Sequence, residues 1–122
     1  MPLKTNPIQS KSFEFGVKMI RLSKQVKENQ NFAISDQLLR SGTSIGANVE
    51  EAQAGETRAD FIHKYGIAQK EAREAIYWLN LLAEAGIVPK RRLAPLIKET
   101  EELYAIITAI IKNAKSKSKM QS

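Results

Sequence analysis

The stretch TRADFIHKYGIAQKEAREAIYWLNLLAEAG, residues Thr57 to Gly86, carries the strongest helical pattern of the chain. Its apolar side chains recur at alternating steps of four and three residues, which is typical of an α-helix with one buried face. The members of this stripe are Phe61, Tyr65, Ala68, Ala72, Ala75, Leu79 and Leu82. Thr57 and Asp60 form a capping-box pattern, which begins a helix, and Gly86 supplies the left-handed residue that ends one. The stretch therefore predicts one long, amphipathic helix.

Three further segments show the same helical period. The first has Ser12 as its predicted N-cap, and its apolar residues are Phe15, Met19, Leu22 and Val26, with Phe13, Val17 and Ile20 beside them. The apolar residues of the second are Ile34, Leu38, Ile45, Val49 and Ala52. The last follows Pro89, and its apolar residues are Leu93, Leu96, Ile97, Leu103, Ile107, Ile110 and Ile111. Short connections make successive helices antiparallel neighbours. We therefore predict an all-α, antiparallel, up-down-up-down four-helix bundle.

The charge distribution separates the ends of the chain from its middle. The formal net charge is +6, yet residues 12–111 hold 13 basic and 13 acidic side chains, so the excess lies outside that range. We expect a flexible segment over residues 1–11, the bundle over residues 12–111, and a basic, disordered tail over residues 112–122. Because the 122 residues include no cysteine, signal-peptide pattern or membrane-length apolar run, we expect a soluble, cytoplasmic protein.

Small residues interrupt the second predicted helix. Gly42 and Gly46 fit neither a Walker loop nor a dinucleotide-binding loop, and each glycine costs a helix about 0.5–1 kcal/mol relative to alanine. Both lie beside Ile45 on a helical wheel, where they allow another helix backbone to approach closely. Ser41, Ser44 and Asn48 lie on the other side of Ile45, where they can bond to a neighbouring helix or to each other.

The predicted third helix has a second apolar face. Tyr77 and Leu81 lie nearly opposite Leu79, the centre of the core stripe, and Trp78 and Ile67 lie on the flank between them. Either neighbouring loops of a short bundle cover these side chains, or they form a homo-oligomer interface. Contiguous exposed aromatic and aliphatic surface favours the interface.

No combination of residues predicts catalysis. The chain has a single histidine, His63, so it lacks the paired motifs of a di-iron bundle and the usual histidine-based zinc sites. A small-molecule site would need an interior polar pocket, and only Ser41, Ser44 and Asn48 could line one. We therefore expect no enzyme activity, no cofactor and no metal.

Three basic clusters are candidates for binding nucleic acid or another partner. The first runs along the first predicted helix at steps of three residues, the second opens the fourth, and the third follows it. Their members are Lys18, Arg21, Lys24 and Lys27, then Lys90, Arg91 and Arg92, then Lys112, Lys115, Lys117 and Lys119. Such cations suit phosphate, but no aromatic residues interleave with them to stack bases. The alternative is that they only keep the protein soluble.

Two motifs carry a resemblance to a known family. LLRSGTSIGANVEEA, residues 38–52, and DFIHKYGIAQKEAREAIYWLNLL, residues 60–82, resemble bacterial four-helix bundle proteins encoded by intervening sequences of 23S ribosomal RNA genes. That family is related to the accessory variability proteins of diversity-generating retroelements. The resemblance covers residues 13–111, and its most specific part is Ser44, Ile45 and Asn48. It implies a non-enzymatic, homopentameric ring with RNA or a reverse transcriptase as partner.

These observations predict an oligomeric scaffold that contacts RNA, or an RNA-bound protein such as a reverse transcriptase, through its basic ends. The alternative is a protein-only oligomeric adaptor, in which the basic ends serve solubility. Binding to structured RNA distinguishes the two hypotheses.

Overall fold

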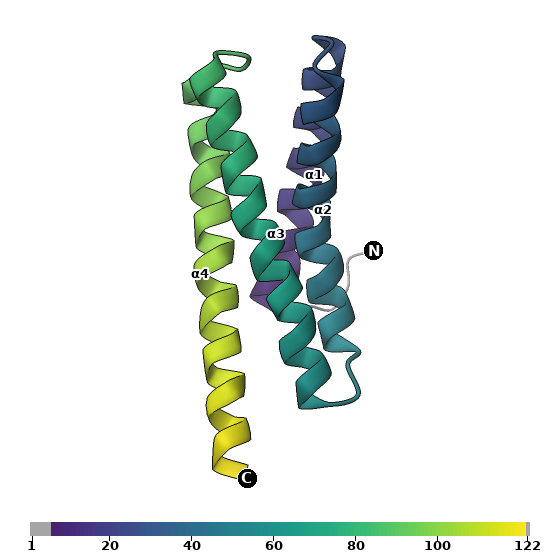
Figure 1. Cartoon of the computed structure of the whole chain (residues 1–122), viewed down its shortest axis with the longest axis vertical. Coiled ribbons are helices and arrows are strands. Elements are labelled where there is room, and N and C mark those ends of the chain that lie inside the picture. The colour runs from purple at the N-terminus through teal and green to yellow at the C-terminus, as the bar shows by residue number, and fades with distance from the viewer. Residues whose placement is uncertain (1–5, 122) are drawn as a thin grey trace.

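The computed structural model describes residues 6–121, with side chains as far as Lys119, and forms an all-α bundle (Figure 1). Its helices are α1 (Pro7–Glu28), α2 (Phe32–Gln53), α3 (Arg58–Ala85) and α4 (Lys90–Gln121). Each helix packs extensively against the next in sequence, whereas α1 and α4 share a much smaller contact. The turns joining α1 to α2 and α3 to α4 lie at the same end (Figure 1). The predicted up-down-up-down four-helix bundle is confirmed.

The predicted third helix is present with both of its expected ends. The Thr57 hydroxyl accepts a hydrogen bond from the Asp60 backbone N–H at 3.0 Å, and Gly86 ends the helix with a φ of 72°. From Tyr65 to Leu82 every residue of the predicted stripe is buried, and Phe61 is half-buried at the start of the helix. Local signals and core burial therefore agree along the whole of α3.

The start of the first helix differs from the prediction. Helix α1 begins at Pro7, because Asn6 accepts a hydrogen bond from the Gln9 N–H and the Gln9 side chain accepts one from the Asn6 N–H. Ser12 is buried inside the helix and donates to the Gln9 carbonyl at 3.2 Å. The expected flexible segment is therefore helical from residue 7, and residues 1–5 lie outside the described part of the chain.

The end of the last helix also differs from the prediction. We expected a disordered tail from residue 112, but α4 continues to Gln121 and extends beyond the other three helices (Figure 1). The apolar period continues past Ile107 and Ile111 to Ala114, which is 7% exposed. Burial of that side chain favours further helical turns, because packing of an apolar face stabilises helices more than propensity does. Residue 122 lies outside the described chain.

The two glycines of α2 lie where α1 approaches most closely. A Cβ atom added at Gly42 would lie 2.6 Å from both Cβ and Cγ of Met19, and one added at Gly46 would lie 3.2 Å from the Ser12 carbonyl oxygen. Nearby, the buried Ser35 hydroxyl donates to the Ser23 carbonyl at 2.6 Å. Small side chains therefore set the spacing of the α1–α2 pair.

The interior is apolar, and its few polar groups are paired. Among the described residues, no buried side-chain nitrogen or oxygen lacks a hydrogen-bond partner. The Tyr65 hydroxyl accepts a hydrogen bond from Gln53 at 2.7 Å, and burial raises its pKa above the ordinary value of 10.0. This bond ties α2 to α3 near the turn between them. None of the described helices contains a stretch long and apolar enough to cross a membrane.

Candidate functional site

Two of the three basic clusters meet at one end of the bundle. The Arg92 guanidinium, in the first turn of α4, donates to the Gln25 side-chain oxygen of α1 at 2.8 Å. Between the two helices lies a groove of about 240 Å³, which we call the basic groove. Its lining residues are Lys18, Arg21, Leu22, Gln25, Val88, Arg92, Leu93 and Leu96. The short α1–α4 contact therefore leaves room for cations from both helices to line one surface.

Acidic neighbours neutralise only part of this charge. Lys18 pairs with Glu99 at 2.8 Å, and Lys90 pairs with Glu84 at 3.3 Å. Arg21, Lys24 and Arg91 are exposed and have no ion-pair partner in the described chain. Both ion pairs are solvent-exposed, so each contributes little and leaves its cation accessible. The end of the bundle around the α3–α4 turn is therefore positively charged.

The lysines at the end of α4 do not join this surface. At 1.5 Å per residue, Lys112 lies roughly 30 Å along α4 from Arg92, and Lys115, Lys117 and Lys119 lie further away. Lys117 instead joins Arg58 in lining a hollow of about 470 Å³ beside the α2–α3 turn. The predicted basic residues thus form two separate positive surfaces, one at each end of the bundle.

The second apolar face of α3 is open to solvent. Tyr77 is 58% exposed and Leu81 is 39% exposed, while Trp78 and Ile67 are half-buried. The Tyr77 and Trp78 rings pack edge to face with centroids 5.0 Å apart. The described chain leaves Tyr77 and Leu81 only partly covered. We call Tyr77, Trp78 and Leu81 the aromatic ridge.

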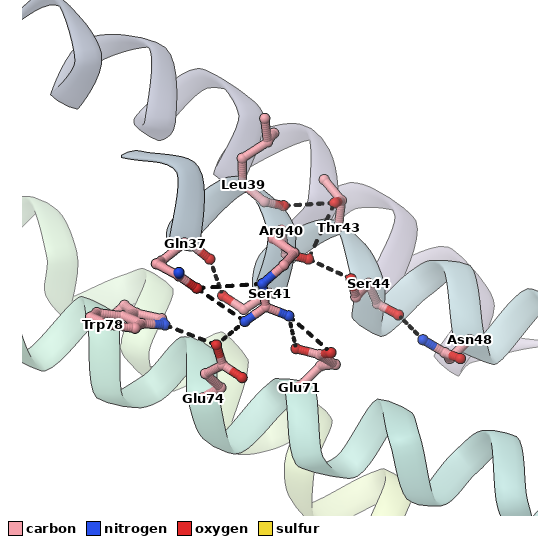
Figure 2. A network of polar contacts seen from close by, with 10 residues as sticks. All are labelled: Gln37, Leu39, Arg40, Ser41, Thr43, Ser44, Asn48, Glu71, Glu74 and Trp78. Carbon is pink, nitrogen blue, oxygen red and sulfur yellow. Dashed lines mark hydrogen bonds and ion pairs between the residues drawn. The ribbon is translucent and has the colours of Figure 1, made fainter. Parts of the chain in front are cut away.

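A polar network fixes one side of the aromatic ridge (Figure 2). The Arg40 guanidinium of α2 donates to both Glu71 carboxylate oxygens, at 3.1 and 3.2 Å, and also bonds to Glu74. The Trp78 indole N–H donates to the same Glu74 oxygen at 3.2 Å. Gln37 completes the network by accepting from Arg40. The indole is thereby held toward α2, with the Tyr77 ring packed beside it.

The polar side chains of the second helix bond within that helix, and the bond from Asn48 to Ser44 joins two of the predicted residues. The Ser41, Ser44 and Asn48 side chains donate to the Gln37, Arg40 and Ser44 carbonyls of their own helix, at 2.7, 2.5 and 2.8 Å. None of them donates to another helix. Figure 2 shows the three residues on successive turns of α2. They therefore do not line an interior polar pocket, while the neighbouring Ile45 is fully buried.

The sequence prediction missed an apolar surface between α1 and α2. Phe13 and Ile20 of α1 are 55% and 49% exposed, and Phe32 and Leu39 of α2 are 55% and 41% exposed. A groove of about 310 Å³ lies along this pair of helices and is lined mainly by apolar atoms. The signal was present in the sequence, because Phe13, Val17 and Ile20 lie beside the core stripe on a helical wheel. We call Phe13, Val17, Ile20, Leu39 and Phe32 the apolar seam.

His63 lies on the surface of α3 and is exposed. Within residues 6–121, no group of three or more histidine, aspartate or glutamate side chains is placed to hold a metal ion. The chemically distinctive surfaces of the described chain are therefore the aromatic ridge, the apolar seam and the two basic ends.

Comparison with known proteins gives a family and a structural relative. The model of the 23S rRNA-intervening sequence protein family matches residues 4–109. A crystal structure from Bacteroides thetaiotaomicron, described as a protein with unknown function from the S23 ribosomal protein family, is 42% identical with a TM-score of 0.83. The match covers 86% of this chain and 98% of that one. The comparison with curated proteins finds no match. The chain belongs to the 23S rRNA-intervening sequence protein family.

Proposed function

We propose that this protein is a non-enzymatic, homopentameric scaffold that contacts RNA, or an RNA-bound protein such as a reverse transcriptase, through its basic ends. The observation that carries the proposal is the combination of an uncovered aromatic ridge with a separate basic groove. The ridge serves self-association and the groove serves an anionic partner.

The support for self-association is chemical. Aromatic residues are enriched in protein interfaces, and a contiguous exposed apolar surface on a small bundle marks association. Tyr77 is more exposed than any other tyrosine or tryptophan in the described chain. The Arg40–Glu74–Trp78 contacts hold part of the ridge in place before a partner arrives. Such preorganisation reduces the entropy lost on binding.

The support for an RNA contact is electrostatic. Arg21, Lys24 and Arg91 have no ion-pair partner among the described residues, so phosphate can approach them without breaking an internal bond. A repeated assembly would display several such basic ends side by side, and multivalent display raises avidity. The residues that line the groove include Lys18, Arg21 and Arg92 but no aromatic ring, which suits phosphate contacts better than base stacking.

A protein-only adaptor is the second candidate function. The observation in its favour is the equal number of basic and acidic side chains in residues 12–111, together with the Lys18–Glu99 and Lys90–Glu84 ion pairs. On this hypothesis the basic ends only maintain solubility.

An RNA-binding measurement distinguishes the two functions. The probe is a fluorescein-labelled RNA hairpin, titrated with protein at several salt concentrations and followed by fluorescence anisotropy. Changing Arg21, Lys24 and Arg91 together to glutamine should weaken binding and lower the slope of log K against log salt by about one per lost phosphate contact. Replacing Lys112, Lys115 and Lys117 by glutamine tests the other end with the same change of charge. Absence of binding at low salt would leave the adaptor function.

A further inference from the structure

We propose that copies of this chain associate head to tail, with the aromatic ridge of one copy seated on the apolar seam of the next. The inference rests on the proposed self-association and adds which two surfaces meet. Its starting point is that the chain carries two different exposed apolar surfaces.

The two surfaces lie on adjacent faces of the bundle and share α2. Leu39 and Arg40 are consecutive, so their side chains diverge by about 100° around the helix. Arg40 points to α3, where it bonds to Glu71 and Glu74. Leu39 lies on the side of α1 and is 41% exposed. One neighbouring copy can therefore cover the seam while another covers the ridge.

The surfaces also have complementary shapes. The ridge carries the packed Tyr77 and Trp78 rings, and Tyr77 remains 58% exposed. The seam includes a hollow of about 310 Å³, where Gly16, Gly46 and Ala47 leave little side-chain volume between the helices. A protruding aromatic group in a hollow with small residues is typical of the anchors of protein interfaces.

Both surfaces lie at similar levels along the bundle. Met19 lies against Gly42, which places Ile20 near Leu39 on the seam. Arg40 bonds to Glu74, which places Tyr77 and Trp78 within about a turn of that same level on the ridge. Two bundles standing side by side can therefore bring the ridge against Ile20 and Leu39, and a shift or tilt toward Phe13 brings it over the hollow, which lies further along α1 and α2. A head-to-tail contact forms a ring when the rotation between neighbouring copies closes, and a filament when it does not.

Charges at the ends of the two surfaces favour the same pairing. Lys24 lies one turn beyond Ile20 on α1 and has no ion-pair partner in the described chain. Glu84 lies beyond Leu81 on α3, and its partner Lys90 is itself exposed. With parallel bundles, Lys24 of one copy lies at the same end of the contact as Glu84 of the next. Opposite charges at a rim favour the correct orientation of two partners.

A mixing experiment tests this pairing. The ridge variant combines Tyr77→Lys with Leu81→Lys, and the seam variant combines Ile20→Lys with Leu39→Lys. All four positions are exposed, so the bundle should fold, which circular dichroism checks. Native mass spectrometry with one variant isotope-labelled should show each variant alone at about the single-chain mass of 13.7 kDa. An equimolar mixture should show twice that mass, with one copy of each variant, because one intact ridge and one intact seam remain.

Other results distinguish a wrong ridge–seam pairing from an absence of self-association. A dimer of the ridge variant alone would show that seam pairs with seam, and a dimer of the seam variant alone would show that ridge pairs with ridge. Monomers in the mixture would also overturn the pairing, provided that wild type is oligomeric. A monomeric wild type would instead refute the proposed self-association. Ala105→Lys, an exposed change on α4, is the matched control and should keep the wild-type mass.

Cysteine crosslinking gives a second readout that leaves the surfaces nearly intact. The chain has no cysteine, so Leu81→Cys and Leu39→Cys each introduce a single thiol. On oxidation, a mixture of the two should form crosslinked pairs that contain one copy of each variant. Crosslinks formed only between identical copies would contradict head-to-tail association.

Discussion

Gly42→Leu should lower the free energy of unfolding by roughly 3 kcal/mol, the upper end of the usual cost of overpacking a core. The Cβ atom alone would lie 2.6 Å from Met19 Cβ and Cγ. Met19 Cβ is fixed to the backbone of α1, so the whole helix has to move. We expect this result in urea denaturation followed by circular dichroism, with all variants at one protein concentration.

Gly66→Ala is the matched control for this prediction. A Cβ added at Gly66 meets nothing within 4 Å, so the change should stabilise α3 by about 0.5–1 kcal/mol through backbone entropy. Truncating Met19 to alanine should cost less in the Gly42→Leu background than in wild type, because the two side chains compete for one space. A Gly42→Leu variant as stable as wild type would refute the close approach of α1 and α2.

Leu79→Ala should lower the free energy of unfolding by about 2–5 kcal/mol, because it leaves a cavity in the centre of the core. Leu79 is fully buried, whereas Leu81, two residues further on, is 39% exposed. The same truncation at Leu81 should change folding stability by only about 0.5 kcal/mol when measured at concentrations too low for assembly.

The two truncations should also differ in their effect on assembly. Leu81→Ala should weaken the oligomer at a given concentration, since it removes part of the aromatic ridge. Light scattering over a dilution series measures the loss of oligomer, and urea denaturation measures the free energy of unfolding. Equal losses of folding stability for Leu79→Ala and Leu81→Ala would contradict the placement of Leu81 outside the core.

Elements with strong local signals could be predicted from the sequence. Helix α3 has the Thr57 cap, an unbroken apolar stripe and the Gly86 stop, and all three are present in the structure. The start of α1 had a signal of the same kind in Asn6, Pro7 and Gln9, which form a cap, a first-turn proline and a reciprocal bond. Serine is common at N-caps, which made Ser12 a candidate, but Asn6 caps the helix and Ser12 lies buried inside it.

Positions in space were harder to predict than helices. The side-chain bonds of Ser44 and Asn48 depend on whether another helix presents acceptors, and here their own helix supplies them. The meeting of Gln25 with Arg92 depends on how α1 and α4 cross, which helical period alone does not contain. To predict the apolar seam, one must know which apolar side chains the other helices leave exposed. Phe13 and Ile20 lie next to the core stripe, so only the packed bundle separates them from it.

The molar mass in solution is the decisive test of the proposed self-association. Light scattering after size exclusion, at micromolar protein concentration, should give a whole-number multiple of the single-chain mass of 13.7 kDa, and five copies for the proposed ring. The ridge variant should elute as a monomer under the same conditions. A wild-type mass of one chain would refute self-association through the aromatic ridge.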